Sequence, residues 1–274
     1  MRTLLLRCVL VALGGYASGS AFAQARDAAG PAAAPTTMPA TAPAAAPSTQ
    51  PILDASAREL VKRLQAAEAR TGFRRLIYDQ EGKIRSVFLS SGLATDENLR
   101  GAAHLPDLTS VRISCSYAGV SPEALSELRR LDHLEKLELR YAANRPVAVE
   151  YGMALARLSN LHTLIISSSE VDLKAVSFLC ALPKLTTLEL RACREFNDAN
   201  VAALMQLRQL EALDLSYTAV SKASLDMLAT LPHLQRVTLT GTAITEEDTA
   251  NSKLTAKVSV KGAKKKLVDN PGAL

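Results

Sequence analysis

The sequence predicts an α/β fold in which about seven strand–helix units stack on one another. An aliphatic-x-x-aliphatic-x-aliphatic pattern recurs seven times in residues 84–252, with starts 24, 26, 27, 24, 25 and 24 residues apart. In most units a helix-capping residue and an apolar helical stripe follow this pattern. A strand and a helix within so few residues cannot bury their apolar faces alone, and the units must therefore stack.

The first 23 residues are typical of an export signal. Arg2 and Arg7 accompany a short apolar run that ends at Leu13, and residues 21–23 (Ala-Phe-Ala) provide a small-x-small cleavage pattern. The run is too short to span a bilayer. We therefore expect an exported protein of the periplasm, the cell surface or the medium, with no transmembrane span after cleavage. The alternatives are an uncleaved anchor or a fortuitous apolar start.

Residues 24–51 are expected to form a disordered linker. They contain eleven Ala and six Pro, and the prolines fall at every fourth residue. Proline interrupts helices, and so few large apolar groups cannot offset the entropy of ordering. The segment would serve as a spacer of at most ~85 Å, or it is a terminus without a role.

Residues 52–83 are predicted to cap the first end of the stack. Asp54 is a helix N-cap type, and an apolar stripe continues to about Arg70 before Gly72 stops the helix. A hairpin of residues 74–78 and 83–90 follows. This helix and first strand would cover the first of the repeats, which occupy residues 84–252.

The repeats themselves are defined by their aliphatic positions. The last two alternate inward on a short strand, and the first enters the core from the preceding turn. The seven patterns begin at Ile84, Leu108, Leu134, Leu161, Leu185, Leu210 and Leu234. Small side chains that can bond the turning backbone follow several strands at Ser116, Ser169, Cys193, Thr218 and Thr242. Helix starts are expected at Thr95, Ser121, Asp172, Asn197, Ser221 and Thr245.

The pattern resembles the leucine-rich repeat family, most clearly in residues 185–193 and 207–218. It is most similar to the exported bacterial members, which carry Thr or Cys where other members carry Asn. The resemblance covers about residues 84–250 and implies a right-handed, curved solenoid whose concave parallel sheet binds proteins or other ligands. The third repeat departs from the pattern, with Ala142 at the ladder position and an expected extended loop over residues 143–147.

The outward strand positions form the candidate binding site. Most are Ser or Thr, but charged residues gather on the central strands, and two tyrosines come just after their strands. Exposed Arg and Tyr beside an aliphatic residue are typical of a binding hot spot. The alternative is that these charges only pair with one another and keep the sheet soluble. The expected partner-binding residues are Phe88, Arg112, Glu138, Arg140, Tyr141, Ile165, Glu189, Arg191, Asp214 and Tyr217.

The net charge of +5 does not indicate a nucleic-acid binder. Residues 1–23 contribute +2 and residues 253–274 contribute +5, which leaves −2 for residues 24–252. Aromatic residues make up 4% of the chain, too few for a base-stacking platform. Residues 253–274 are expected to form a cap strand, over residues 256–261, and a basic tail. Lys264, Lys265 and Lys266 would bind an anionic envelope polymer or remain solvated.

Catalysis, cofactors and metals are not expected. Glu189 and Asp214 occupy equivalent positions on adjacent strands, about 5 Å apart, as in a retaining glycosidase pair. An open sheet offers no enclosed pocket, however, and Arg140 and Arg191 are expected to lower both pKa values. No His lies at metal-ligand spacing from a second ligand. Among the thiols, Cys115 is expected to be exposed, and Cys180 and Cys193 to be buried and structural.

The sequence therefore predicts a monomeric, non-catalytic scaffold that binds a protein partner on its concave face. One alternative is a cell-envelope structural protein that binds anionic polymer or polysaccharide through the basic tail. Another is a secreted, host-directed effector that uses the same concave surface. The identity of the partner does not follow from the sequence.

Overall fold

The computed structural model describes residues 53–115 and 120–260. The predicted export signal, the Ala/Pro-rich segment, Ser116 and the tail lysines Lys264, Lys265 and Lys266 lie outside the described residues.

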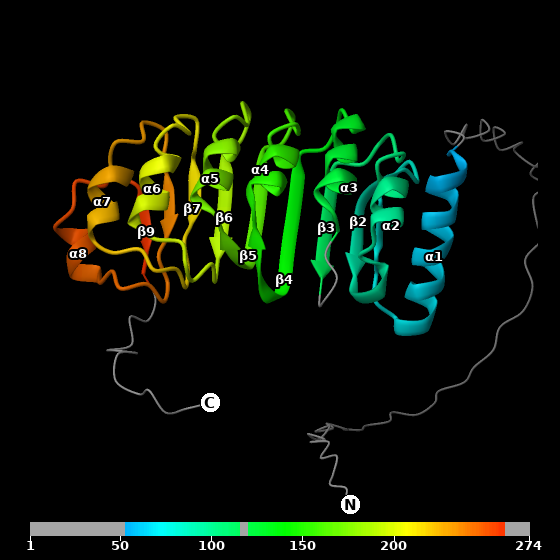
Figure 1. Cartoon of the computed structure of the whole chain (residues 1–274), viewed down its shortest axis with the longest axis horizontal. Coiled ribbons are helices and arrows are strands. Elements are labelled where there is room, and N and C mark those ends of the chain that lie inside the picture. The colour runs from blue at the N-terminus through cyan, green and yellow to red at the C-terminus, as the bar shows by residue number, and fades with distance from the viewer. Residues whose placement is uncertain (1–52, 116–119, 261–274) are drawn as a thin grey trace, which may run out of the picture. The chain divides into compact units, whose positions relative to one another are not determined.

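The described residues form one nine-stranded sheet whose strands follow the chain order (Figure 1). β1 pairs with β2 in the antiparallel direction, and every later pairing is parallel. This alternation of parallel strands with helices agrees with the predicted repeat solenoid. The strands are β1 (Leu76–Tyr78), β2 (Ile84–Ser90), β3 (Ser110–Cys115), β4 (Lys136–Val147), β5 (Thr163–Val171), β6 (Thr187–Arg191), β7 (Ala212–Asp214), β8 (Arg236–Thr238) and β9 (Lys257–Ser259).

The helices form a row beside the sheet in the same order as the strands (Figure 1). Within the described ranges, none is both long and apolar enough to cross a bilayer. They are α1 (Ala55–Thr71), α2 (Asp96–Ala102), α3 (Pro122–Ser126), α4 (Val149–Leu155), α5 (Leu173–Leu179), α6 (Asp198–Leu204), α7 (Ala223–Leu228) and α8 (Glu246–Ala250). Two short 3₁₀ helices are η1 (Ser91–Leu93) and η2 (Glu127–Arg130).

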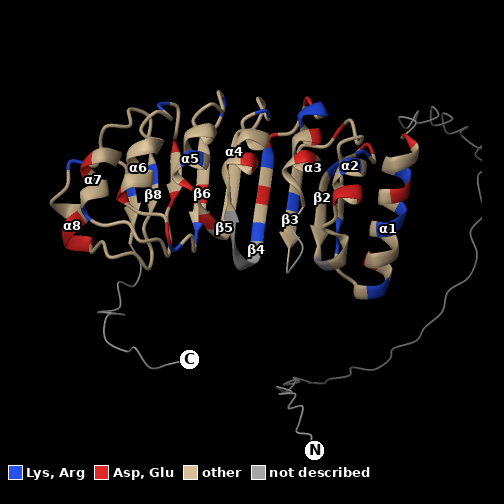
Figure 2. Cartoon of the chain, in the orientation of Figure 1, with Lys and Arg blue, Asp and Glu red and all other residues tan. Residues whose placement is uncertain are grey.

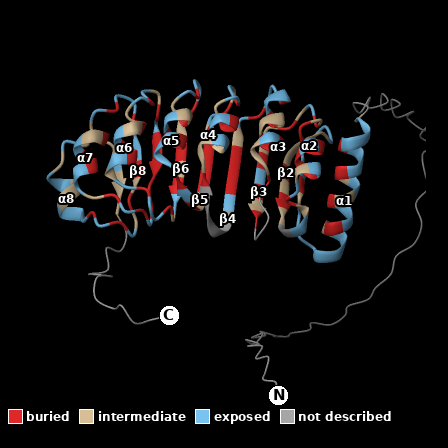
Figure 3. Cartoon of the chain, viewed as in Figure 1, coloured by how far each residue is buried: buried red, intermediate tan, exposed pale blue. Residues whose placement is uncertain are grey.

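The core lies between the sheet and this row of helices (Figure 3). The repeat's aliphatic positions fill it, as predicted, because strand alternation sends every second side chain to the same side. One lateral row of strand partners runs from β2 to β8, and each member is at most 2% exposed. This row consists of Val87, Val111, Leu137, Leu164, Leu188, Leu213 and Val237. Burying each such side chain contributes about 2 kcal/mol.

The predicted starts and stops of the helices are largely confirmed. α1 begins after Asp54, whose side chain accepts a hydrogen bond from the Ala57 amide, and ends at Gly72 with φ of 68°. The capping residues expected for α2, α3, α5, α6 and α8 also accept bonds from their first turns. Ser221 is displaced by one position, because Lys222 is the N-cap of α7. Its hydroxyl still accepts a bond from the Ala223 amide at 3.2 Å.

The predicted hairpin is confirmed, but the expected loop in the third repeat is wrong. Residues 143–147 continue β4 as a strand, after an irregularity between Arg140 and Arg145. The continuation pairs with the end of β5, from Ser169 to Val171. The end of β5 runs alongside these residues and pairs with their backbone N–H and C=O groups. A projecting loop would leave those groups without such partners, and the sequence pattern of one repeat does not show that the neighbouring strand provides them.

The repeats of β5 to β8 share a left-handed backbone turn, which lies within β5 and beyond the ends of β6, β7 and β8. The residue two positions beyond the last aliphatic position has a left-handed φ of 54° to 72° in these repeats. Only the last of these positions is a glycine, so the turn has little sequence signal. The four residues are Ser168, Ala192, Tyr217 and Gly241. The small side chain that follows each is buried, with Thr218 and Thr242 donating hydrogen bonds to strand carbonyls, as predicted.

Candidate functional site

The parallel register brings the predicted site residues into one row on the outer sheet face, the side of the sheet that points away from the core. Successive Cα partners across β2 to β7 are Phe88, Arg112, Glu138, Ile165, Glu189 and Asp214. Two residues further along their strands, Arg140 and Arg191 are both Cα partners of Ser167. Figure 2 shows the alternation of basic and acidic residues along β4.

Arg112, Glu138 and Arg140 form the first group, which we call the Glu138 cluster. The Arg112 Nε donates to Glu138 Oε2 at 2.6 Å, and the Arg140 Nε donates to Glu138 Oε1. The carboxylate is 2% exposed, whereas the arginine side chains are 45% and 56% exposed. The Arg112 guanidinium also lies over the Phe88 ring, 5.5 Å from its centroid. One buried acid thus holds two guanidinium groups at the surface.

Glu189, Arg191 and Asp214 form the second group, the Asp214 cluster. Arg191 donates from Nε to Asp214 Oδ2 at 2.7 Å, and its Nη2 lies 3.0 Å from Glu189 Oε2. Asp214 Oδ1 accepts from the amide and the hydroxyl of the buried Ser216, at 2.9 and 2.5 Å. One arginine here bridges two acids, and one of those acids also fixes the backbone that follows β7.

The expectation that the whole row is exposed is wrong for three of its six members. Glu138, Ile165 and Asp214 are buried, with residue exposures of 2%, 7% and 8%. The two carboxylates lie beneath longer arginine side chains that pair with them, Arg112 and Arg140 over Glu138 and Arg191 over Asp214. The structure therefore presents guanidinium groups outward, with carboxylates beneath them.

The pKa of Glu189 also differs from the expectation. Burial raises it above its ordinary value, and the negative charges of Asp214 and Glu138 act in the same direction, against Arg191 and Lys136. The prediction that the arginines lower both pKa values is therefore wrong for Glu189. Glu189 and Asp214 are adjacent Cα partners, as predicted. Both oxygens of Asp214 already accept hydrogen bonds, which favours a structural role for this carboxylate over proton transfer.

Tyr217 is the exposed aromatic residue at the edge of the row. It is 58% exposed, and its amide donates to the Thr240 carbonyl at 2.8 Å. A Cβ atom on Gly241 would lie 2.4 Å from the Tyr217 ring, so the ring packs directly over this glycine. Tyr141 lies in β4 as the Cα partner of Cys115, but its side chain is outside the described residues.

The thiols are shielded from reaction. Cys115 is buried at 3% exposure, contrary to the expectation that it is exposed, because it ends β3 on the core side. Burial raises the pKa of both Cys180 and Cys193 to about 11, so neither carries a reactive thiolate near neutral pH. Cys193 is buried as predicted, and Cys180 is half-buried. In the part of the chain that the structure describes, no group of three potential metal ligands occurs.

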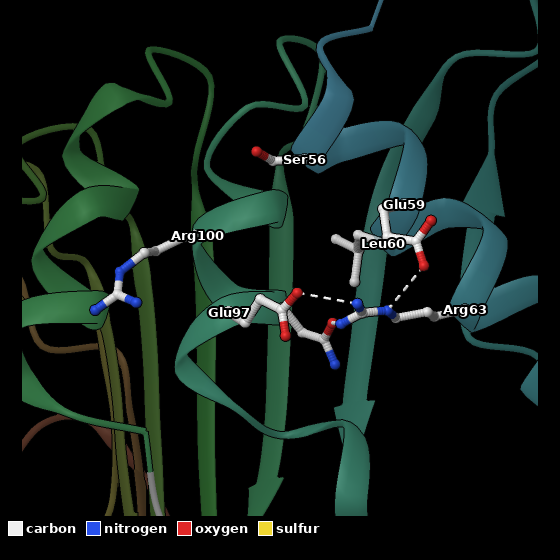
Figure 4. A pocket seen from close by; sticks show the side chains of 7 residues that line it. Ser56, Glu59, Leu60, Arg63, Glu97 and Arg100 are labelled. Carbon is white, nitrogen blue, oxygen red and sulfur yellow. Dashed lines mark hydrogen bonds and ion pairs between the residues drawn. The ribbon is translucent and has the colours of Figure 1, made fainter.

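A pocket of about 180 Å³ lies between α1 and α2, away from the row (Figure 4). The Arg63 side chain occupies its floor and bonds Glu59 at 3.1 Å, Glu97 at 2.9 Å and the Asn98 side chain at 3.2 Å. These mutual bonds hold the capping helix against the first repeat. The pocket is lined by Ser56, Glu59, Leu60, Arg63, Glu97, Asn98 and Arg100.

Three contributors to the face were absent from the sequence-based site. Arg75 lies over Phe88 on β2, 5.9 Å from the ring centroid. Ser216 anchors Asp214, and Lys136 acts electrostatically on Glu189. The outward positions of Lys136 and Ser216 in the repeat pattern could have indicated that these two residues belong to the site. Arg75 precedes β1 outside the repeat, so the pattern could not indicate it.

The sequence matches no protein-family model, and no curated protein matches it. Among solved structures, internalin C2 from Listeria monocytogenes is 20% identical with a TM-score of 0.44, covering 76% of this chain and 93% of that chain. Internalin F from the same organism is 19% identical with a TM-score of 0.38, covering 61% and 51%. A TLR13–ssRNA13 complex is 23% identical with a TM-score of 0.42, covering 60% and 23%. Because these identities and TM-scores are low, the fold assignment is based on the sheet register and the sequence repeat instead.

Proposed function

We propose that the chain is a non-catalytic scaffold that binds a protein partner on its outer sheet face. One observation carries this proposal: exposed arginines project from the strands themselves and are held by carboxylates buried beneath them. Side chains fixed on a rigid sheet lose little conformational freedom when a partner binds, which favours affinity. A site made only for solubility would not need buried acids to orient its cations.

The proposal includes a domain organisation. Residues 1–23 act as an export signal, residues 24–51 as a linker, and residues 52–83 as a cap. Seven repeats in residues 84–252 form a leucine-rich-repeat-like solenoid whose concave side is the outer sheet face. The solenoid is right-handed, because crossover connections between parallel strands are almost always right-handed. Residues 253–274 add a cap strand and a basic tail. The protein acts as a monomer, outside the cytoplasm.

The test is a steric block at the centre of the face. Ser167 points outward between Arg140 and Arg191 and is half-buried. In a pull-down from envelope and extracellular fractions, Ser167→Trp in the full chain should lose the partner that the wild type captures. Ser177→Trp is the matched control, because Ser177 is an exposed residue of α5 on the helix side.

The outcome separates the proposed site from the basic tail. Deletion of Lys264, Lys265 and Lys266 should leave capture unchanged if the outer sheet face binds the partner. If Ser167→Trp captures the same proteins as the wild type, the outer sheet face is not the binding site. If only the tail deletion abolishes capture, binding of an anionic envelope polymer is the better description.

A further inference from the structure

The charges of the folded domain are unevenly distributed, with an excess of bases at the outward strand positions. Residues 53–260 contain 25 Lys or Arg and 25 Asp or Glu, a net charge of zero. The three lateral lines of outward strand positions hold six bases and three acids, which is 6 − 3 = +3, so the rest of the folded domain carries −3. The bases are Arg112, Lys136, Arg140, Arg191, Arg236 and Lys257, and the acids are Glu138, Glu189 and Asp214.

Burial increases this imbalance where a partner would make contact. The side chains of Glu138, Asp214 and Glu189 are 2%, 10% and 22% exposed. The three arginines that cover them are 45% to 56% exposed. Because a partner meets the guanidinium groups first, this face attracts negative charge more strongly than its net charge indicates.

The two clusters differ in the donors that they leave for a partner. In the Glu138 cluster, each arginine donates a hydrogen bond to the acid through Nε, and among the described residues none accepts a hydrogen bond from the Nη atoms of Arg112 or Arg140. In the Asp214 cluster, Arg191 contacts one acid through Nε and the other through Nη2. The first cluster therefore presents available guanidinium donors, and the second uses more of its own.

The Glu138 cluster is also held in place before any ligand arrives. Glu138 anchors both guanidinium groups from below, and the Phe88 ring packs against that of Arg112. Ser114, the Cα partner of Arg140, adds a hydroxyl group beside them on the same face. Two oriented guanidinium groups on neighbouring strands match the paired oxygens of a carboxylate.

We infer that Arg112 and Arg140 bind a carboxylate side chain in an acidic, extended segment of the protein partner. This inference rests on the proposed function, and it adds the chemical class of the partner segment and the two residues that bind it. Lys136, Arg236 and Lys257 share a second lateral line of this face with Thr163, Thr187 and Ala212, and would attract further acidic residues of the segment. Among the described side chains of this face, exposed aromatic rings do not form the series on which nucleic-acid bases would stack.

The test uses a short fluorescein-labelled peptide of alternating Glu and Ser, with a Gln/Ser peptide as reference. The fluorescence anisotropy of each labelled peptide is measured as the full chain is added, and only the Glu peptide should show binding. The double variant Arg112→Gln/Arg140→Gln should weaken that binding by about tenfold or more, since it removes two charge-assisted contacts. Equal affinity of this variant and the wild type for the Glu peptide would overturn the inference.

Two further variants separate the guanidinium site from general charge attraction. Arg129→Gln/Arg157→Gln makes the same charge change at exposed residues that lie outside the strands, and it should change affinity by less than about twofold. Arg112→Lys/Arg140→Lys keeps the charge but loses the planar fork, and most of the affinity should be lost. If the control double variant loses as much affinity as Arg112→Gln/Arg140→Gln, or if the Lys variant binds like the wild type, the inference is wrong. Circular dichroism and Tm establish that each variant is folded.

Two results distinguish this inference from the broader proposal. Partner capture that is lost with Ser167→Trp but unchanged with Arg112→Gln/Arg140→Gln would retain the binding face and reject the carboxylate site. Unchanged capture with Ser167→Trp would reject the proposed function itself. A labelled single-stranded oligonucleotide that binds more tightly than the Glu peptide, through the same two arginines, would overturn the assignment of an acidic protein segment.

Discussion

The Glu138 cluster and the Asp214 cluster lie on the same sheet face, yet their charge balance is opposite. Two arginines surround one acid in the first cluster, and two acids surround one arginine in the second. Ile165 separates the two acids of the central row, Glu138 and Glu189, as the Cα partner of both. The same residue types in the same repeat positions thus form two different clusters. The Glu138 cluster has guanidinium donors to spare, and the Asp214 cluster also supports the backbone turn that follows β7.

The difference shows that charge type and strand position do not by themselves identify a binding residue. Arg140 and Arg191 occupy equivalent positions, and both are about half exposed. What separates them is the number of acids that each one contacts. An arginine that already satisfies two carboxylates has less to gain from a third, whereas two arginines that share one carboxylate attract another anion.

Replacing Asp214 in one cluster and Glu138 in the other should give the largest contrast in stability. Asp214→Ala leaves the amide and hydroxyl of the buried Ser216 without an acceptor, at a cost of about 2 to 3 kcal/mol. Glu138→Ala should cost about 1 kcal/mol, because the exposed arginine heads can be hydrated. Urea unfolding of the full chain measures both values, with the exposed Asp132→Ala as the control. Equal losses would mean that the two acids have the same role.

Removing one arginine from each cluster should give a smaller contrast in the same direction. Arg191→Gln leaves Glu189 and Asp214 side by side without their shared cation, and we expect a loss of about 1 to 2 kcal/mol. Arg140→Gln leaves Glu138 paired with Arg112, and the loss should be below about 1 kcal/mol. Both are read from the midpoint of denaturant unfolding at unchanged slope. A larger loss for Arg140→Gln would reverse the assignment of the structural cluster.

The pH dependence of Glu189→Gln should give the smallest effect. Burial raises the pKa of Glu189 in the folded chain, so folding favours the protonated carboxyl. That contribution is present below the unfolded pKa and is lost as pH rises through the folded pKa. The stability of Glu189→Gln relative to the wild type should therefore increase from about pH 4 to about pH 7, by less than ~1 kcal/mol.

Asp198→Asn provides a control of opposite sign. Burial acts to raise the pKa of Asp198, but hydrogen bonds from Ser221 and Ser224 outweigh it and lower the pKa. The folded chain therefore favours the ionised Asp198, and this stability is lost as pH falls. The Asn variant should become less stable relative to the wild type as pH rises from about 2 to about 5, around and below the ordinary Asp pKa. A slope of the same sign for both variants would contradict the role given to burial at Glu189.

The repeat period by itself determined the strand order, the register and the inward positions. Leu188 and Leu213, for example, occupy the same repeat position and are Cα partners in the sheet. Asp54 and Gly72 likewise marked both ends of α1. These features follow from the spacing of aliphatic residues and from helix-capping residue types, and both can be identified in a single sequence.

The depth of each outward side chain depends on contacts between repeats, which the sequence pattern does not contain. Strand alternation assigns Glu138 and Arg140 to the same outer face, but it cannot say that one is 2% exposed and the other 56%. That depth depends on the side chains that cover the acid, here Arg112 from β3 and Arg140 from β4 itself. The extension of β4 and the left-handed turns at Ser168 and Ala192 have the same kind of origin. Each is determined by contacts with the adjacent repeat, and such contacts exist only once the repeats have stacked.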